Sequence, residues 1–275
     1  MAIEPFLDPI PELNLLIFTR GNVPLSPSAK ALMVHLKRQP NALHGALIGR
    51  PAAGALLFYG LAKQTVFRAS MNNRGPIMMM RPKLLQNFLD ATFVVADRFV
   101  TDHHSKLSVS RIWAALQTHS EISEGAGTGL PVCSQLGDAT KPSLFQDPEL
   151  CRLIDAFVAL EPALSWRVPD GSRLHASTNF EHSHANTVIV GPSGIERRDD
   201  LLIGVSLLAS NVRYPDHSHP PEETYLVLSD GSFRQKNGAW FTPGIGGTFY
   251  NSPGIVHAMR SGDSPLLAVW LLWAG

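Results

Sequence analysis

The residues best suited to chemistry lie in two short segments near the carboxyl end of the chain. His217 and His219 are two residues apart, so on an extended strand both imidazoles point to the same side. Glu223 follows in the same segment, and His257 comes just after the Pro253-Gly254 pair of the second segment. Three imidazoles and one carboxylate suit a first-row divalent ion such as Fe, Mn, Zn, Co or Ni, and they leave positions open for water or substrate.

The spacing of these four residues matters more than the histidines alone. A second HxH pair, His182 and His184 in "EHSHAN", has no carboxylate or proline turn after it and is expected to be structural or to lie behind the site. The segments at 217–257 instead combine HxHxxxE with G-x5-P-G-x-x-H, which resembles the two-part signature of cupin metal sites. The sequence therefore predicts one metal centre, with the ligands His217, His219, Glu223 and His257.

Two tyrosines flank the first segment. Tyr225 is two residues after Glu223, so we expect it on the same strand face, beside or on the metal. Tyr214 precedes the histidines, but Pro215 interrupts the strand, and counting residues does not fix its side. A tyrosine has a pKa near ~10, and a cation within a few ångströms favours its phenolate. Tyr225 is predicted to be a general base, with Tyr214 as the alternative.

Short β-like segments position these residues. They are separated by turn signals such as "DG", "NG" and "TPGIGG", which is typical of a sandwich or barrel of the jelly-roll type. We expect this barrel over residues 163–275. The predicted strands are 184–191, 201–209, 223–229, 231–235, 247–252 and 265–273.

A helical subdomain is predicted before the barrel, over residues 78–162. Apolar residues at helical spacing predict helices over 81–100, 108–119 and 147–160. The last of these has Asp147 as its N-cap and Pro148 at its first helical position.

Residues 1–77 are expected to form an N-terminal extension without a sustained pattern. A short helix is predicted over 24–39, and the segment near 13–39 resembles a fragment of LysR-type regulator effector domains over about 25 residues. No DNA-binding segment accompanies that fragment.

Composition narrows the class of protein. The chain has 275 residues and a formal net charge of zero, which argues against binding driven by bulk charge to nucleic acid or to a membrane surface. The apolar run 54–62 is too short to span a bilayer, and the N-terminus lacks the basic region of a secretory signal. Two cysteines without CxxC spacing suggest reduced thiols. We expect a cytoplasmic monomer or homodimer.

From Arg81 to Gly275 the chain resembles the bacterial cupin-type dimethylsulfoniopropionate (DMSP) lyases. The stretches that carry the resemblance are "NTVIVGPSGIERRDD", "VRYPDHSHPPEETYLVLSDG" and "WFTPGIGGTFYNSPGIVHAMRSGDSPLLA", together with the flanking tyrosines. The resemblance implies a mainly β fold, with a cupin barrel preceded by a small α-helical subdomain. It also implies a metal-dependent carbon–sulfur lyase that cleaves DMSP to dimethyl sulfide and acrylate by base-catalysed β-elimination.

That zwitterionic substrate sets further expectations. Its carboxylate would bind the metal, which acts as a Lewis acid, while an aromatic face would hold the sulfonium by cation–π attraction. Tyr250, Trp270 and Trp273 are the candidates for this face. Trp270 and Trp273 lie on opposite faces of their strand, and the resemblance favours Trp273. The predicted substrate-binding residues are therefore Trp273, Tyr250 and Tyr214.

Two other functions fit the same residues. A cupin dioxygenase acting on another small carboxylate would use the same ligands to hold Fe(II), and oxygen uptake would distinguish it from a lyase. A non-catalytic, ligand-sensing cupin would keep its affinity in a Tyr225→Phe variant and show no activity in either form.

Overall fold

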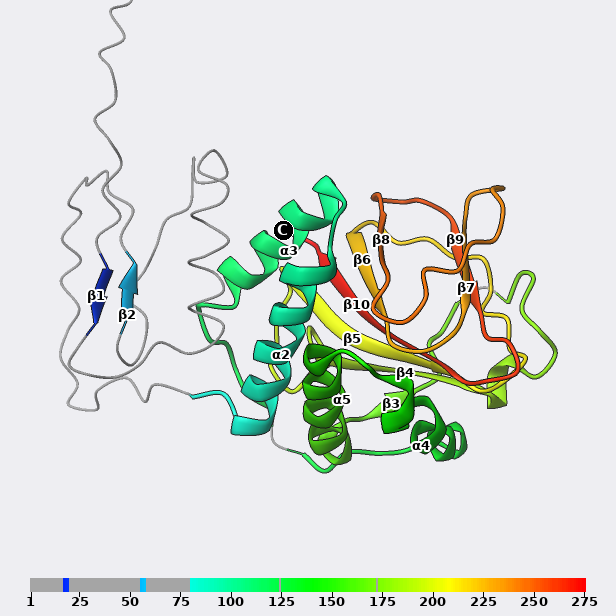
Figure 1. Cartoon of the computed structure of the whole chain (residues 1–275), viewed down its shortest axis with the longest axis horizontal. Coiled ribbons are helices and arrows are strands. Elements are labelled where there is room, and N and C mark those ends of the chain that lie inside the picture. The colour runs from blue at the N-terminus through cyan, green and yellow to red at the C-terminus, as the bar shows by residue number, and fades with distance from the viewer. Residues whose placement is uncertain (1–16, 20–54, 58–79, 124, 172) are drawn as a thin grey trace, which may run out of the picture.

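The computed structural model describes residues 17–19, 55–57, 80–123, 125–171 and 173–275 (Figure 1). Two short strands, β1 (Ile17–Thr19) and β2 (Ala55–Leu57), pair antiparallel near the N-terminus. The helix predicted over 24–39 lies outside the described residues, as does almost all of the LysR-like fragment, so both stay predictions.

Three long helices precede the β region: α2 (Lys83–Phe99), α3 (His103–Ala115) and α5 (Pro148–Leu160), with a short α4 (Leu136–Ala139) between the last two. The predictions for 81–100 and 147–160 agree with α2 and α5 to within two residues. The helix predicted over 108–119 corresponds to α3, which ends four residues earlier than predicted. It also begins five residues earlier, because the Asp102 carboxylate accepts a hydrogen bond from the Ser105 amide and caps the helix there. Among the described residues, no helix combines the length and apolar character needed to cross a bilayer.

The predicted N-cap of α5 is confirmed. Asp147 Oδ1 accepts hydrogen bonds from the amides of Glu149 at 2.8 Å and Leu150 at 3.4 Å, and Pro148 is the first helical residue. The other carboxylate oxygen of Asp147 pairs with Arg98 of α2 at 2.8 Å.

Asp147→Ala is therefore expected to lower the free energy of unfolding by ~1 kcal/mol, because two helical amides lose their acceptor. Asp147→Asn keeps an oxygen at the same place and loses only the charge, so it should cost less. Urea denaturation of the two variants measures the difference. Equal losses would mean that the ion pair, not the cap, carries the effect.

The β region forms two antiparallel sheets. The large sheet has the order β3-β4-β5-β10-β6-β8, and the small sheet consists of β7 and β9. All six predicted strands are present, whereas β3 and β9, of two and four residues, were not predicted. The bounds are β3 (Trp166–Arg167), β4 (His184–Val190), β5 (Leu201–Leu208), β6 (Glu222–Val227), β7 (Ser232–Gln235), β8 (Thr248–Asn251), β9 (His257–Arg260) and β10 (Leu266–Trp273).

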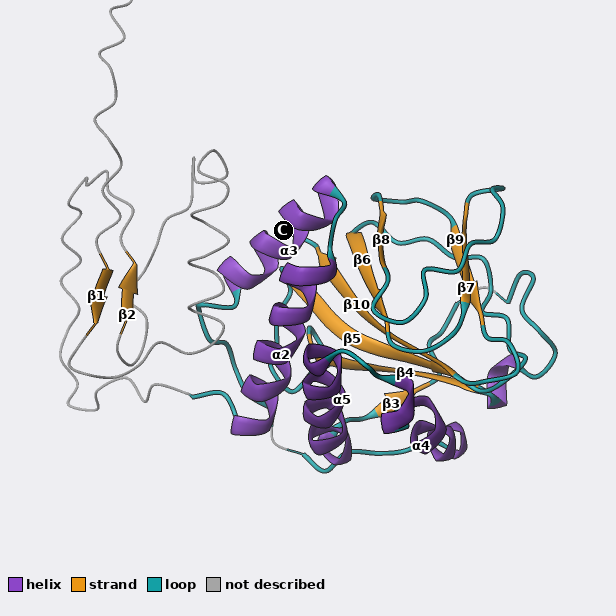
Figure 2. Cartoon of the chain, in the orientation of Figure 1, coloured by secondary structure: helices purple, strands orange, loops and turns teal. Residues whose placement is uncertain are grey.

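The central strands of the large sheet are buried on both faces, which explains their nearly continuous apolar sequences. One face packs against the helices, with Ile203, Val205 and Leu271 in a core cluster shared with α2, α3 and α5. The other face, with Val227, Ala268 and other alternate residues, encloses a second cluster together with Phe233 and Met259 of the small sheet. Figure 2 shows this layering, with helices on one side of the large sheet and β7 and β9 on the other.

The helices and the large sheet thus share one core. The apolar surface of the helical segment is buried against the β region. The boundary at residues 162/163 is therefore proposed only as the point in the chain where helices give way to strands, not as a gap between two cores. The two cysteines, Cys133 and Cys151, are free and partly buried in this region.

The turn between β4 and β5 is tied to the helices by buried charges. Glu196 is fully buried, pairs with Arg81 and accepts a hydrogen bond from the Ser120 amide at 3.1 Å. Arg198 donates to the carbonyls of Ala115 and Thr118, at and just beyond the end of α3. The charged stretch 196–200 therefore positions the helices against the sheet.

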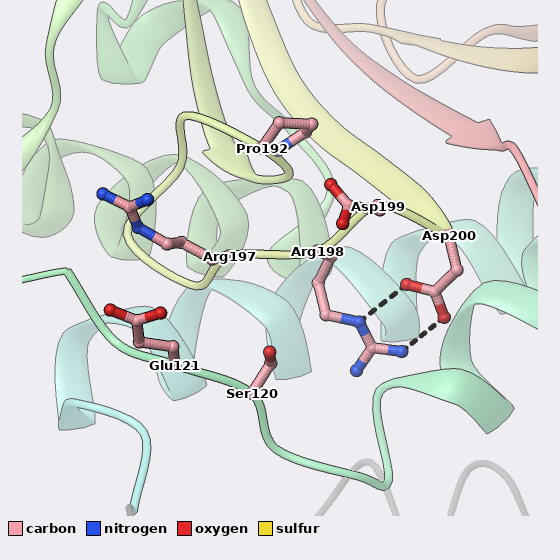
Figure 3. A pocket seen from close by; sticks show the side chains of 7 residues that line it. All are labelled: Ser120, Glu121, Pro192, Arg197, Arg198, Asp199 and Asp200. Atoms are coloured by element: carbon pink, nitrogen blue, oxygen red, sulfur yellow. Dashed lines mark hydrogen bonds and ion pairs between the residues drawn. The ribbon is translucent and has the colours of Figure 1, made fainter.

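A surface hollow of about 540 Å³ lies beside this turn, lined by residues of the 192–200 turn and by Ser120 and Glu121. Figure 3 shows Arg198 turned toward Asp200, with which it makes two contacts of 2.7 and 2.5 Å. The Arg198 guanidinium in the lining of this hollow is therefore already paired.

Candidate metal centre

The two histidine segments meet because they run antiparallel beside each other. His217 and His257 exchange backbone hydrogen bonds of 3.0 and 2.9 Å, and their ring centroids are 4.1 Å apart. The amide of Gly254 also donates to the carbonyl of His219 at 2.9 Å. Residues 40 positions apart in the sequence are thereby brought into one cluster.

The turn before His257 depends on its proline and glycine. The Ile255 amide donates to the Ser252 carbonyl at 3.1 Å, which closes a four-residue turn with Pro253 and Gly254 at its centre. Gly254 has a φ of 70°, a conformation that favours glycine and that a type II turn requires at this position. The tight turn predicted at Pro253-Gly254 is confirmed.

The candidate ligand atoms converge on a small volume. His217, His219 and His257 each offer a nitrogen, and these nitrogens all lie within 4.8 Å of one another. Glu223 Oε2 lies 3.4 Å from His219 Nε2 and 3.2 Å from His257 Nε2. Ligand atoms about 2.1 Å from one ion are separated by roughly 3.0–3.4 Å in octahedral or tetrahedral arrangements, so the two Glu223 distances suit a common ion.

Each imidazole is oriented by a backbone carbonyl. Nδ1 lies within hydrogen-bond distance of the carbonyl of Pro215 for His217, of Pro221 for His219 and of Ile255 for His257, at 2.9, 2.9 and 3.0 Å. A proton on each Nδ1 leaves Nε2 with a free lone pair, which is the form that binds metals. Among the described residues, His257 Nε2 is buried without a hydrogen-bond partner, so the donor set fits a divalent ion.

The charge states of Glu223 and His217 also suit a cation. Burial opposes ionisation of Glu223, but its contacts with His219 and His257 lower its pKa well below the usual value. Burial, followed by the nearby His257, lowers the pKa of His217 to about 4, so that its ring is neutral at pH 7. An ionised carboxylate and a neutral imidazole are the forms needed for metal binding.

Both tyrosines lie in the barrel interior beside this cluster. The Tyr214 ring centroid is 4.8 Å from that of His217, and its hydroxyl accepts a hydrogen bond from Asn186 Nδ2 at 3.3 Å. The Tyr225 ring is 6.2 Å from the His257 ring and is 3% exposed. Tyr214 therefore shares the interior with the histidines, a point that residue counting across Pro215 did not decide.

The two tryptophans of β10 point in opposite directions, as the strand period predicts. Trp270 belongs to the interior cluster with Tyr214 and Tyr225, whereas Trp273 packs against the helix-facing core. The indole of Trp270 lies over Gly204, where an added Cβ would come within 2.1 Å of the ring. The structure thus brings Trp270, and not the favoured Trp273, toward the tyrosines.

Tyr250 also lies away from the interior. Its hydroxyl donates to Glu222 Oε2 at 2.6 Å, and its ring stacks on His104 of α3 at 5.3 Å. Glu222 is the strand neighbour of Trp273, so both predicted aromatic residues lie on the helix-facing side of the sheet. A second surface hollow of about 340 Å³ is found there, lined in part by Trp273, Glu222 and Arg111.

His184, of the second HxH pair, lies buried deeper in the barrel and stacks on Phe180. Burial lowers its pKa to about 4 from the ordinary 6.5. Between these two values the unfolded chain binds a proton that the folded protein does not, so stability falls as the pH drops from 6.5 toward 4. This group should contribute ~2 kcal/mol to that loss, since each pKa unit corresponds to about 1.4 kcal/mol and solvent screens part of the shift.

A His184→Gln variant is therefore expected to lose less stability than the wild type over this pH range. Urea denaturation at pH 7, 6, 5 and 4 measures the difference. His182→Gln is the matched control, because it removes the exposed histidine of the same HxH pair. Identical pH profiles for wild type and His184→Gln would contradict the prediction.

Two known proteins resemble the chain in sequence. It is 32% identical over 136 residues to the dimethylsulfoniopropionate lyase DddQ of Ruegeria pomeroyi, an alignment that covers 47% of this chain and 66% of the relative. It is 34% identical over 94 residues to the putative dimethylsulfoniopropionate lyase DddL of Cereibacter sphaeroides, covering 34% of this chain and 39% of the relative. The aligned part of the chain thus spans less than two thirds of either relative.

The fold matches the same group of proteins. The crystal structure of the DMSP lyase DddQ from Ruegeria pomeroyi superposes with a TM-score of 0.54 at 23% identity, covering 69% of this chain and 91% of that structure. This likeness confirms the expected cupin fold with a helical part before it. The model of the dimethylsulfoniopropionate lyase family matches residues 104–268, which include all four candidate ligands and both interior tyrosines. The chain therefore belongs to the dimethylsulfoniopropionate lyase family.

Proposed function

We propose that this protein is a metal-dependent carbon–sulfur lyase that cleaves DMSP to dimethyl sulfide and acrylate. The observation that carries the proposal is the convergence of three imidazoles and Glu223 beside two buried tyrosines, in a chain of this family. His217, His219, Glu223 and His257 would hold one divalent ion of Fe, Mn, Zn, Co or Ni, since this mixed N/O set suits all five.

An ion held there supplies Lewis acidity toward the substrate carboxylate and offsets the negative charge that develops when the α-proton leaves. The protein orients this donor set through the three backbone carbonyls that fix Nδ1 of each histidine. Their imidazoles are thereby held with Nε2 toward the common centre before substrate arrives.

The proton is taken by a tyrosine, and Tyr225 is our first choice. In the protein alone, burial raises the pKa of Tyr225 well above its usual value, and the negative charge of Glu223 raises it further. A cation beside the hydroxyl opposes both effects and favours phenolate. The phenolate oxygen accepts the α-proton, the C–H electrons form the new double bond, and the C–S electrons leave with neutral dimethyl sulfide.

The sulfonium group would face the aromatic side chains of the barrel interior. Tyr214 and Trp270 supply such faces, and cation–π attraction contributes about 0.5–2 kcal/mol for each favourable pair. This assignment replaces Trp273 and Tyr250, whose contacts are with the helix-facing side. A smaller aromatic at position 270, as in Trp270→Phe, should raise KM more than it lowers kcat.

Headspace dimethyl sulfide over purified protein given DMSP tests the activity. Sulfide release should vanish after chelation and return when Fe(II) or Mn(II) is restored, because the proposed elimination needs the bound ion. No sulfide from folded, metal-loaded protein would overturn the substrate assignment.

Oxygen uptake in the same assay distinguishes elimination from dioxygenase chemistry, because elimination consumes no oxygen. Binding of DMSP without turnover would favour a sensing role instead. The cytoplasmic location and the monomeric or homodimeric state remain predictions.

A further inference from the structure

The four candidate ligands come from both sheets of the barrel. Glu223 lies on β6 of the large sheet, whereas His257 begins β9 of the small sheet and pairs with the strand segment that holds His217. Any motion of one sheet relative to the other changes the distance between the carboxylate and these imidazoles. The barrel therefore needs a connection between the sheets close to this cluster.

Such a connection exists between two amide side chains. Gln235 Nε2, on β7, donates to Asn251 Oδ1, on β8, at 2.7 Å, and Asn251 Nδ2 donates to Glu223 Oε2 at 2.9 Å. Gln235 Nε2 also donates to the carbonyl of Tyr250 at 2.6 Å. Asn251 is fully buried and Glu223 is 3% exposed, so the hydrogen bond between them is shielded from water, whereas Gln235 is partly buried.

Strand register places both amides next to ligands. Asn251 is the cross-strand partner of Glu223, and Gln235 is the cross-strand partner of His257. The hydrogen bond between the two amides thus joins the strand beside one ligand to the strand beside another.

The direction of these hydrogen bonds is fixed chemically. An ionised carboxylate only accepts, so Asn251 must present its NH₂ group to Glu223 and its carbonyl oxygen to Gln235. The Glu223 oxygen that accepts this bond is also the oxygen closest to His219 and His257. Asn251 therefore acts on the atom that would bind the ion.

We propose that Asn251 and Gln235 are positioning residues that hold the Glu223 carboxylate for metal binding. The inference rests on the proposed metal site. Removal of a group that orients a metal ligand in this way typically weakens metal binding by about 10- to 100-fold.

The test measures metal affinity without DMSP. Metal-free wild type, Asn251→Leu and Gln235→Leu are titrated with Co(II) against a competing chelator, and the visible spectrum of each Co(II) form is recorded. Thr224→Val is the matched control, because Thr224 is a fully buried neighbour of Glu223 whose hydroxyl has no hydrogen-bond partner among the described residues.

Asn251→Leu is expected to weaken Co(II) binding by about 10- to 100-fold and to alter the visible bands, since the carboxylate is no longer oriented. Gln235→Leu should change affinity and spectrum in the same direction by a smaller factor, and it decides the matter if Asn251→Leu does not fold. Thr224→Val should stay within twofold of wild type.

Unchanged Co(II) affinity and spectrum in both amide variants would overturn the inference. A Thr224→Val loss as large as that of Asn251→Leu would do the same, because it would indicate a general effect of packing on β6. Wild type that binds no Co(II), Mn(II) or Fe(II) would instead refute the proposed metal site itself.

Discussion

His257→Ala is expected to abolish sulfide release and to leave the purified protein with little bound metal. His257 Nε2 is buried and has no hydrogen-bond partner among the described residues. It lies 3.2 Å from Glu223 Oε2, and the carbonyl of Ile255 orients its ring. Loss of the bound ion removes several kcal/mol of charge stabilisation in the transition state, which corresponds to a rate loss on the order of a thousandfold.

Metal content by elemental analysis and sulfide release by headspace assay measure the two effects together. His182→Ala is the control, because it removes an exposed histidine outside the cluster. A His257→Ala protein that keeps one metal per chain and most of its rate would remove His257 from the ligand set.

The ligand segments could be predicted from the sequence because their geometry is local. The two-residue spacing of His217 and His219, and the turn at Pro253-Gly254, each fix the direction of a side chain within a few residues. The α5 cap at Asp147 was predictable for the same reason, since an acceptor and the amides it caps are adjacent in the sequence.

The surroundings of the site depend on pairings between distant strands, which spacing does not encode. Asn251 and Gln235 reach the carboxylate only through the register of β6 with β8 and of β7 with β9. Tyr250 and Trp273 have the right chemistry, but their strand positions direct them toward α3 and the helix-facing core. The inward position of Trp270 could have been predicted from Gly204 in the middle of β5. A glycine inside a strand often marks the close approach of another group, and here that group is the Trp270 ring.

Tyr225→Phe is expected to lower kcat by a hundredfold or more while the bound metal stays in place. A general base typically contributes 10²–10⁴-fold, and phenylalanine keeps the stacking of this ring on Phe249 at 5.1 Å while removing the oxygen that accepts the proton. Sulfide release at saturating DMSP, with metal content measured on the same sample, tests the prediction.

Tyr214→Phe is the matched comparison, because both rings are buried in the same interior cluster and each variant removes one hydroxyl. The Tyr214 hydroxyl accepts a hydrogen bond from Asn186, a side chain outside the ligand set, so its removal should cost less than tenfold in kcat. The two tyrosines therefore differ in the group beside the hydroxyl. Tyr225 is next to Glu223 of the ligand set, whereas Tyr214 is next to the neutral amide of Asn186. The reverse order of losses, with metal retained in both variants, would transfer the role of base to Tyr214.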